Sequence, residues 1–478
     1  MRPRARKDSP ASSSLHRSVV RIFATTQARD YQCPWQAEPP EHGTGSGVII
    51  GPGQVLTGAH VVADATFLRV QKVSDPDKWV AEVTAINHDC DLALLTVRDA
   101  SFMKGVKAER LGALPHLRDR VSVVGYPIGG EEVSITEGVV SRIEMQRYSH
   151  SQRNLLAVTV DAAINEGNSG GPVFKDGLVA GIAFQSLEGA ENIGEMVPSN
   201  LIERFLSGVK KGRSPGVPGL GLVMQNLENP LLRKRVGMSG SESGLLVVGV
   251  EHGSSADGHV LVGDALLELD GHRIANNGTV QYSGHFRTGC DVLLGDHYAG
   301  DVIELKVLRQ GRVLKMKIEL LPFVSLVPRS QYDTLPTYFV FAGLVFQPLS
   351  LDYLRTWPDW WKEAPPELIH HSHCGIRTSE RQEIIVLSQV LADPITVGYE
   401  GLEQATVAKV NGRAPRDMRD LVRTLEGTKG LIEIQISDES LVVIDPSEAR
   451  RASRPMLARY HIRSDRSHDL PRRAKRAS

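Results

Sequence analysis

Short apolar runs dominate residues 18–198, and turn residues interrupt them at regular intervals. Each run has the length of a single strand, and glycine, proline, asparagine and aspartate break the sequence between the runs. Such evenly spaced short strands are typical of an all-β barrel or sandwich, and this pattern constrains the fold more than any other feature of the sequence. The clearest runs are Ser18–Phe23, Gly47–Ile50, Leu92–Leu95, Val121–Val124 and Leu156–Val160.

A helix and a linker are predicted to end the β-rich region. Ser199 is expected to cap the N-terminus of the helix, and the apolar residues after it recur at the spacing of one helix face. Residues 210–218 combine lysine, glycine and proline, which is typical of a linker. The predicted apolar face consists of Leu201, Ile202, Phe205, Leu206 and Val209.

The sequence after the linker repeats one outline twice. Apolar residues followed by Asp-Gly or Asn-Gly occur at 267–271 and again at 408–412. This recurrence predicts two copies of one small α/β fold, of which the second is diverged and carries a long insert over 347–383. In the second copy a helix is expected to end at Gly427, and strands follow. The helix face consists of Met418, Leu421, Val422 and Leu425, and the strands cover 431–436 and 441–444.

The bulk composition is that of a folded protein with several domains. A chain of 478 residues exceeds one ordinary core, which predicts about two to four domains. The formal net charge of −1 argues against nucleic acid or a membrane surface as partner of the whole chain. The four cysteines lie far apart, which suits a reducing compartment. Because no apolar run approaches the ~20 residues of a membrane span, and no signal peptide is recognisable, we expect a soluble, intracellular protein that is not secreted.

Both ends of the chain are basic. Residues 1–17 contain five Lys/Arg and one acid, and residues 446–478 contain ten Lys/Arg and three acids. We expect both segments to be solvated, disordered tails. The alternatives are the remnant of a targeting peptide at the front, and a nuclear localisation or nucleic-acid-binding patch at the back. Chloroplast, mitochondrion and nucleus therefore all stay open as compartments.

Three short segments carry residues suited to catalysis, in the order His, Asp, Ser. His60 ends the run Leu56-Thr-Gly-Ala, Asp91 precedes an apolar strand, and Ser169 lies among glycines that permit positive φ. Serine becomes a good nucleophile only when a base takes its proton, and a third group must hold that base in one tautomer. The spacings suit a protease of two barrels, with the site between them. Asp89 is the alternative to Asp91 as the orienting acid.

These segments resemble the Deg/HtrA (protease Do-like) family, and the resemblance covers residues 18–445. It rests on Thr57–His60, Asp91–Leu95 and Gly167–Pro172. It implies a mostly β chain, in which a chymotrypsin-like double β-barrel is followed by two small PDZ-like α/β modules. Further runs are similar to the plant and algal branch of the family, namely 124–130, 138–143, 161–165, 181–186, 274–280, 326–328 and 341–346.

The domain organisation expected from this resemblance has five parts. They are a basic disordered tail over 1–17, a chymotrypsin-like protease domain over 18–212, a PDZ domain over 213–322, a second, diverged PDZ-like domain over 323–445, and a basic disordered tail over 446–478.

The resemblance also implies roles for individual residues. Ser169 would attack the scissile carbonyl, His60 would act as general base and then acid, and Asp91 would orient the imidazole. The backbone N–H groups of Gly167 and Ser169 would form the oxyanion hole. An apolar specificity pocket for small or medium aliphatic side chains would be outlined by Ala163, Ala183 and Phe184.

The loop Gly219, Leu220, Gly221 and Leu222 is expected to bind the C-terminal carboxylate of a peptide, which would add to a sheet edge. The alternative is that this module only packs against the protease or a neighbouring subunit. The insert over 347–383 departs from a standard PDZ pattern and contains three tryptophans. An assembly role is therefore an equal alternative to peptide binding for the third module.

No cofactor and no metal site is predicted. The run His370–Cys374 is interpreted as a surface or packing segment, because adjacent side chains point in different directions and no second ligand cluster accompanies it. The glycines include no phosphate-binding loop followed by Lys-Ser or Lys-Thr, so the activity is expected to be independent of ATP.

The sequence thus predicts an ATP-independent serine endopeptidase that degrades unfolded or damaged proteins, which is a role in protein quality control. The resemblance implies a homo-oligomer built from trimers. The alternative, from another class, is a non-proteolytic chaperone or PDZ scaffold that keeps the triad inactive. The two hypotheses differ in whether Ser169 can be acylated.

Overall fold

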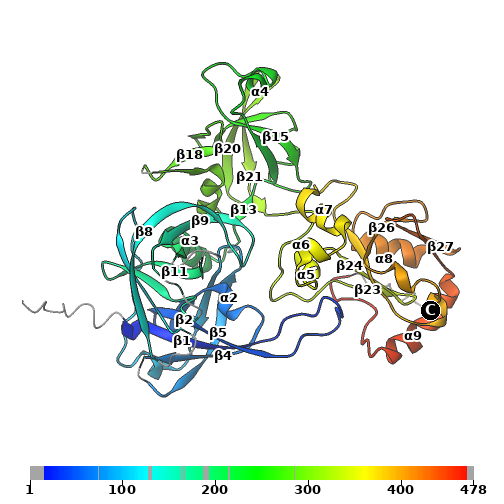
Figure 1. Ribbon diagram of the computed structural model, residues 1–478, viewed down its shortest axis with the longest axis horizontal. Helices are drawn as coiled ribbons and strands as arrows, with labels where there is room; N and C mark the ends of the chain where they lie inside the picture. Colours follow the sequence, from blue (N-terminus) through cyan, green and yellow to red (C-terminus); the bar gives the residue numbers. More distant parts are fainter. Residues whose placement is uncertain are drawn as a thin grey trace, which may run out of the picture.

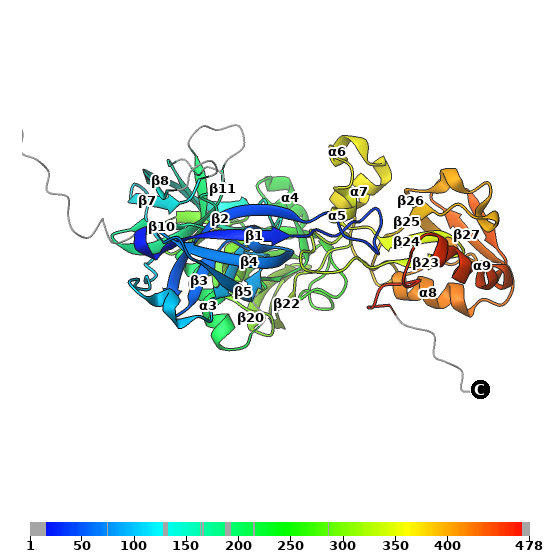
Figure 2. The same cartoon turned by 90° about the horizontal axis from the view of Figure 1, so that it is seen from below.

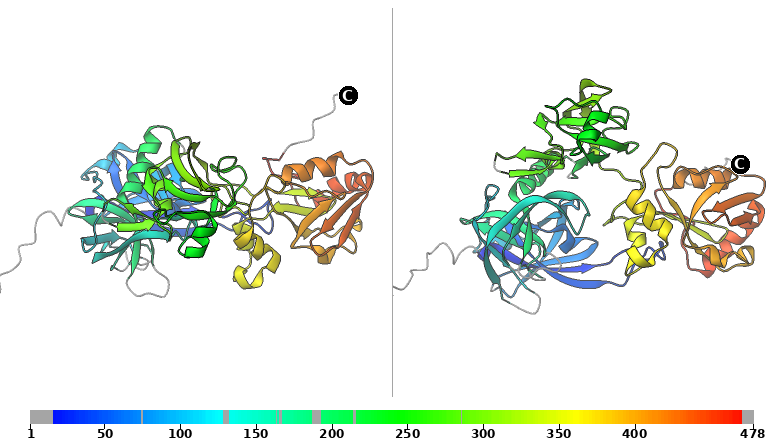
Figure 3. Two further views of the ribbon diagram at one scale, coloured as in Figure 1. Left: turned by 90° about the horizontal axis from the view of Figure 1, so that it is seen from above. Right: turned by 45° about the horizontal axis from the view of Figure 1, so that its top comes forward.

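A computed structural model describes residues 16–73, 75–127, 132–162, 164, 167–186, 193–213, 216–284 and 286–470. Two closed β-barrels form the first body, and a second and a third module each contain a six-stranded sheet. The three bodies lie around a central connecting segment (Figure 1), and the right-hand view of Figure 3 separates them. The predicted mostly β architecture with a double barrel is confirmed. Within the described residues, no helix is long and apolar enough to cross a membrane.

The first barrel closes six strands in the order β1-β2-β3-β6-β5-β4. Alternate side chains of β1 (Val19–Thr26) point into it, so Val20 and Ile22 are fully buried. Phe102 from η2 (Ala100–Met103) belongs to the same core. The remaining elements are β2 (Glu41–Gly51), β3 (Gln54–Thr57), the one-turn helix α2 (Ala59–Val62), β4 (Ala65–Lys72), β5 (Lys78–Asn87) and β6 (Leu92–Thr96).

The second barrel closes in the order β10-β11-β12-β9-β8-β7. Its strand β9 (Asn154–Val160) is buried almost throughout, because its side chains reach three different cores. Val158 points into the barrel, Leu155 into the contact with the first barrel, and Leu156 into the second module. The other strands are β7 (Arg120–Gly125), β8 (Ser134–Arg147), β10 (Pro172–Lys175), β11 (Leu178–Ser186) and β12 (Gly194–Pro198).

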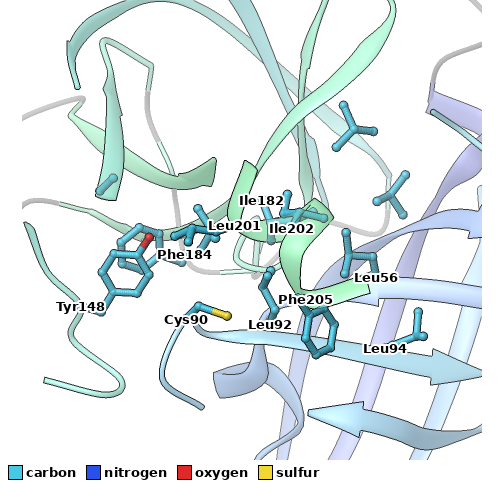
Figure 4. Packing of buried hydrophobic residues seen from close by; sticks show 14 of the residues in the cluster. Leu56, Cys90, Leu92, Leu94, Tyr148, Ile182, Phe184, Leu201, Ile202 and Phe205 are labelled. Atoms are coloured by element: carbon cyan, nitrogen blue, oxygen red, sulfur yellow. The ribbon is translucent and has the colours of Figure 1, made fainter. Parts of the chain in front are cut away.

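One apolar cluster joins the two barrels and thereby fixes the position of the site between them (Figure 4). It contains Leu56 and Leu92 from the first barrel and Ile182 from the second. Helix α3 (Ser199–Lys210) adds Phe205, and its predicted apolar face is confirmed. The prediction of Ser199 as its N-cap is wrong, because Pro198 holds the cap position and Ser199 is buried in the first turn.

The second module is a sheet in the order β14-β15-β16-β20-β21, with β17 paired to β16. Strand β14 (Leu222–Asn226) has one neighbour and is therefore a sheet edge. The other elements are β13 (Pro218–Gly219), α4 (Pro230–Arg235), β15 (Leu245–Val250), β16 (Ala265–Leu269), β17 (His272–Arg273), β18 (Thr279–Tyr282), β19 (Phe286–Gly289), η3 (Cys290–Asp296), β20 (Val302–Arg309), β21 (Arg312–Glu319) and β22 (Leu321–Pro322).

The third module is a sheet in the order β23-β24-β25-β26-β27-β28. Strand β24 (Leu344–Pro348) pairs on both sides, since β23 (Phe339–Phe341) turns back onto it. Ala342 and Gly343 have φ of 52° and 85°, as a two-residue hairpin turn requires. The other elements are β25 (Ile385–Val390), η4 (Pro394–Thr396), η5 (Glu400–Leu402), β26 (Ala405–Val410), α8 (Met418–Gly427), β27 (Ile432–Ile436) and β28 (Leu441–Ile444). The predicted helix ending at Gly427 and the two strands after it are confirmed.

The insert of the third module forms three short helices that stand out from the sheet (Figure 2). Their core contains Leu354 and Leu368, with Trp357 and Trp360 packed against it. The helices are α5 (Leu351–Leu354), α6 (Trp360–Glu363) and α7 (Pro366–Cys374).

The chain between β1 and β2 reaches across to the third module (Figures 1 and 2). Gln347 Nε2 donates a hydrogen bond to the Tyr31 carbonyl at 3.1 Å. Trp35 meets Tyr338 edge to face, with ring centroids 5.9 Å apart. The first barrel therefore contacts the third module directly.

The prediction of a disordered tail over 446–478 is wrong for residues 446–470. Helix α9 (Pro446–Arg459) begins there, and the Asp445 carboxylate caps it by accepting the N–H groups of Ser447 and Glu448. Met456 and Ile462 are buried against the sheet. Residues 471–478 lie outside the described residues. The basic composition predicted disorder wrongly, because the arginines belong to a helix. A few apolar residues of this segment are enough to pack it against the sheet.

Substitution of Met456 tests this docking. Met456 is 1% exposed, so Met456→Ala leaves a cavity. We expect the free energy of local unfolding of the third module to fall by about 2–5 kcal/mol. Hydrogen exchange of the β24 amides measures this value. Arg454→Ala on the exposed side of the same helix is the control, and equal protection in the two variants would contradict the packing described.

Candidate active site

His60 and Asp91 form a doubly hydrogen-bonded pair. Asp91 Oδ2 lies 2.7 Å from His60 Nδ1, and Asp91 Oδ1 accepts the backbone N–H of His60 at 2.8 Å. The strand pairing explains why His60 and Asp91 lie together, because β3 and β6 pair antiparallel with Thr57 opposite Ala93. The residues that follow β3 and those that precede β6 therefore lie at the same end of the barrel.

Asp91 is fully buried and adopts φ of 54°, a conformation that aspartate tolerates better than most residues. Burial alone would raise the pKa of its carboxyl, but the charge and hydrogen bonds of His60 outweigh burial and lower it. For His60, burial alone would lower the pKa, but the Asp91 carboxylate outweighs burial and raises it. The pair therefore favours an ionised Asp91 and a more basic imidazole.

Asp89, the alternative acid, lies in the same turn but faces away from His60. Its Oδ2 accepts the backbone N–H of Val217 at 2.8 Å, and its Oδ1 lies 3.3 Å from Arg153 Nη1. It thus connects the turn to the start of the second module. Asp91, and not Asp89, accepts the hydrogen bonds of His60, so the geometry favours Asp91 as the orienting acid.

Ser169 lies on the loop before β10, and this loop packs against the start of α2. Ser46 N–H donates to the Ser169 carbonyl at 2.9 Å, and Ser46 Oγ donates to the Gly167 carbonyl at 2.7 Å. Gly170 has φ of 79°, and a Cβ there would lie 3.0 Å from the backbone nitrogen of Gly58. The serine loop of the second barrel and the histidine helix of the first barrel are therefore in contact.

Three polar groups of His60 and the serine loop have no hydrogen-bond partner among the described residues. His60 Nε2 is buried, and no described residue forms a hydrogen bond with it. The backbone N–H groups of Gly167 and Ser169 likewise have no hydrogen-bond partner among the described residues. A serine hydrolase keeps two such N–H donors available for the oxyanion of a substrate. It uses Nε2 differently, because this nitrogen accepts the serine hydroxyl, and that hydrogen bond is absent among the described residues.

The predicted specificity residues lie on β11, beside the serine loop. Ala183 exchanges backbone hydrogen bonds with it, since Gly170 N–H donates to Ala183 O at 2.7 Å. Phe184 is 4% exposed and stacks on Tyr148 at 4.3 Å, so it belongs to the core shown in Figure 4. Ala163 lies outside the described residues. Sequence reasoning missed Glu195, whose fully buried carboxylate accepts a hydrogen bond from Gln185 Nε2.

The predicted peptide-binding loop, Gly219–Leu222, borders a cavity of about 270 Å³. The cavity lies beside the edge strand β14, and Leu294 of η3 also lines it. Arg153 of the second barrel and Arg329 of the connecting segment border it too. Burial lowers the pKa of Arg329 to about 10, which leaves it charged at neutral pH.

The sequence-based prediction did not include the aromatic residues that pack next to His60. The His150 ring lies 6.3 Å from the His60 ring, and Tyr332 stacks on His150 at 3.9 Å. His88 Nδ1 lies 3.0 Å from His150 Nε2. Burial lowers the pKa of His150 to about 4, so this imidazole is neutral at physiological pH. These residues come from three separate parts of the chain, and no local motif marks them.

Comparison with known proteins relates this geometry to established families. The trypsin-like peptidase domain matches residues 45–182, and the PDZ domain matches residues 327–469. The PDZ match thus falls on the module that the sequence analysis treats as the diverged copy, and it includes α9. The solved structure of the HtrA-type protease AlgW with tripeptide has a TM-score of 0.51 and 26% identity, and the alignment covers 65% of this chain and 95% of that one.

Relatives align over nearly the whole length. The chain is 37% identical to protease Do-like 2, chloroplastic, of Arabidopsis thaliana, over 96% of this chain and 76% of that protein. It is 35% identical to putative protease Do-like 13 of the same plant, over 97% of this chain and 91% of that protein. Protease Do-like 4, mitochondrial, is also 35% identical, with coverages of 95% and 85%. The chain therefore belongs to the Deg/HtrA, or protease Do-like, family and is a trypsin-like serine protease with a PDZ domain.

Proposed function

We propose that this protease is an ATP-independent serine endopeptidase that degrades unfolded or damaged proteins, with His60, Asp91 and Ser169 as its triad. The observation that carries the proposal is the His60–Asp91 pair, joined at 2.7 Å and 2.8 Å beside the Ser169 loop of the other barrel. A buried carboxylate on Nδ1 leaves Nε2 as the proton acceptor, which is the tautomer that a general base toward serine requires.

In this mechanism Ser169 Oγ attacks the scissile carbonyl and His60 Nε2 takes its proton. Asp91 stabilises the imidazolium that forms, and His60 then returns the proton to the leaving amine. The N–H groups of Gly167 and Ser169 bind the oxyanion, and each such donor contributes about 3–4 kcal/mol to transition-state stabilisation. The absence of a described partner for either N–H supports this role.

The substrate would be selected at two places. Small or medium aliphatic side chains would enter an apolar pocket formed by Ala163, Ala183 and the backbone at Phe184. Peptide C-termini would bind the Gly219–Leu222 loop, where Arg329 adds a positive charge beside the cavity. Because β14 is a sheet edge, a peptide can add to it there, whereas β24 of the third module is paired on both sides.

We infer in addition that the protein assembles as a homo-oligomer and lies in an organelle. Family membership favours a homo-oligomer built from trimers. Relatives named chloroplastic and mitochondrial favour an intracellular organelle over the nucleus. The domains proposed are a protease over 18–212, a PDZ domain over 213–322 and a second PDZ-like domain from 323, now extended through α9.

The second candidate is a chaperone or PDZ scaffold with an inactive triad. One observation favours it, because no described residue forms a hydrogen bond with His60 Nε2. In an active triad at rest, the serine hydroxyl donates to this nitrogen.

Cleavage of unfolded casein by the wild type and by Ser169→Ala separates the two candidates. We expect the wild type to cleave casein and to react covalently with a fluorophosphonate, and the variant to do neither. Labelling is followed by mass spectrometry of the intact chain. A wild type that neither cleaves nor reacts, yet suppresses aggregation of a denatured client protein, would favour the chaperone.

The pH dependence of kcat/KM tests His60 as the base. Only neutral His60 accepts the serine proton, and Asp91 raises its pKa above the usual value of about 6.5. Activity should therefore rise with pH through an apparent pKa above ~6.5 and level off in the alkaline range. A rate that is constant from pH 5 to 8 would exclude this base.

Gly170→Ala tests the packing of the serine loop, with Gly177→Ala as a matched control. Both glycines have φ near 80°, but a Cβ at Gly170 meets Ser46 O and Gly58 N, whereas a Cβ at Gly177 has nothing within 4 Å. Backbone strain of about 1–3 kcal/mol is common to both. We expect fluorophosphonate labelling to slow by more than about tenfold in Gly170→Ala only. Equal rates in the two variants would show that the contact is unimportant.

A further inference from the structure

One carboxylate from the segment between the second and third modules touches both catalytic segments of the first barrel. Asp333 Oδ1 accepts the backbone N–H of Asp64 at 2.8 Å. Asp333 Oδ2 lies 3.0 Å from His88 Nε2. Asp333 is separated by 269 residues from Asp64 and by 245 from His88 in the chain.

The two partners are adjacent to the proposed catalytic residues. Asp64 follows α2, the one-turn helix that carries His60. His88 opens the turn that presents Asp91, and its carbonyl accepts the Asp91 N–H at 3.4 Å. The Asp333 side chain therefore spans the same two segments that the His60–Asp91 hydrogen bonds join.

The backbone of Asp333 and the residue before it are also fixed by contacts with the first body. Its backbone N–H donates to Asp64 Oδ1 at 2.8 Å, which makes the contact reciprocal. The preceding residue, Tyr332, stacks on His150 with an interplanar angle of 12° and donates its hydroxyl to the His150 carbonyl at 3.0 Å. Two consecutive side chains of the connecting segment, Tyr332 and Asp333, thus pack against residues next to the His60–Asp91 pair.

The charges agree with this arrangement. The hydrogen bond from His88 is the main cause that lowers the pKa of Asp333, so its carboxylate accepts through both oxygens at neutral pH. Burial raises the pKa of Asp64. His88 Nδ1 also shares a hydrogen bond with His150 Nε2 at 3.0 Å, so the contact of Asp333 continues through His88 to His150. The ionisable groups near the His60–Asp91 pair are His150, with His88 beyond it, and on Asp91 also Cys90 and Tyr148, whose pKa values burial raises.

We propose that Asp333 is a positioning residue for catalysis, which fixes the His60 segment relative to the Asp91 segment only while the connecting segment is docked. The rate of acylation then depends on the position of the third module, because residues 334–338 lead directly into β23. The Asp333 side chain is 41% exposed, so solvent competes for its hydrogen bonds and the contact can open. This inference rests on the triad proposed above.

Asp333→Asn tests the proposal. The amide has one acceptor oxygen, so while it accepts from Asp64 N–H it can bind His88 only as a donor, which requires His88 to accept at Nε2 and to reverse its hydrogen bond with His150. We expect kcat for a peptide substrate to fall by about ten- to a hundredfold, as small misplacements of catalytic groups do, with KM unchanged within about twofold. A loosened His60–Asp91 pair raises the basicity of His60 less, so the acid limb of the pH profile should move to lower pH. Asp359→Asn, a carboxylate on the exposed insert, is the control.

Labelling by a fluorophosphonate separates positioning from loss of folded protein. Positioning predicts a lower rate constant with the same final labelled fraction. An unchanged rate constant, whether or not the labelled fraction falls, would overturn the proposal, and so would an unmoved acid limb. His88→Gln should lower kcat similarly, and the double variant His88→Gln/Asp333→Asn should show no additive loss. If the wild type is not labelled at Ser169, the proposed function fails first. If labelling requires Ser169 and Asp333→Asn behaves like the wild type, only this inference fails.

Discussion

The buried carboxylate of Asp91 is the constraint on which the rest of the site depends. It has no exposure to solvent, and a buried charge that loses its partner costs about 3–5 kcal/mol. Both oxygens are compensated by one residue, His60, through its ring and its backbone N–H. This requires α2 to begin where β3 ends and Asp91 to stand directly before β6, which the antiparallel pairing of the two strands supplies. The core between the barrels then brings the serine loop of the second barrel to the same place.

Sequence reasoning succeeded where the information is local, because the alternation of β1 and the apolar face of α8 follow from adjacent positions. His60, Asp91 and Ser169 also each lie in a motif of a few residues, and their joint role as a triad stays a prediction. Sequence reasoning failed at residues 446–470 because net charge was given more weight than capping. Asp445 followed by Pro446 is a helix start signal, and the apolar Met456 and Ile462 are enough to dock the segment.

The contacts between modules could not be predicted, since no periodicity within a segment encodes them. Asp89 and Asp91 stand two positions apart in one turn, and only the folded chain shows that one faces Val217 and the other His60. The contacts of Asp333 with Asp64 and His88 likewise form only in the folded chain. The turn from His88 to Asp91 therefore receives contacts from both connecting segments, and the local motif around Asp91 gives no sign of it.

The third module is attached to the first barrel at two separate places, the loop with Tyr31 and Trp35 and the segment with Asp333. Both attachments belong to one chain, so when either opens, the other keeps its surfaces at a high effective concentration. The open contact then re-forms as an intramolecular event. Separation of the module from the first barrel requires both attachments to be open at once, which is rarer than the opening of either one. A competitor for one attachment alone leaves the module on the barrel, whereas one that covers both would separate the two.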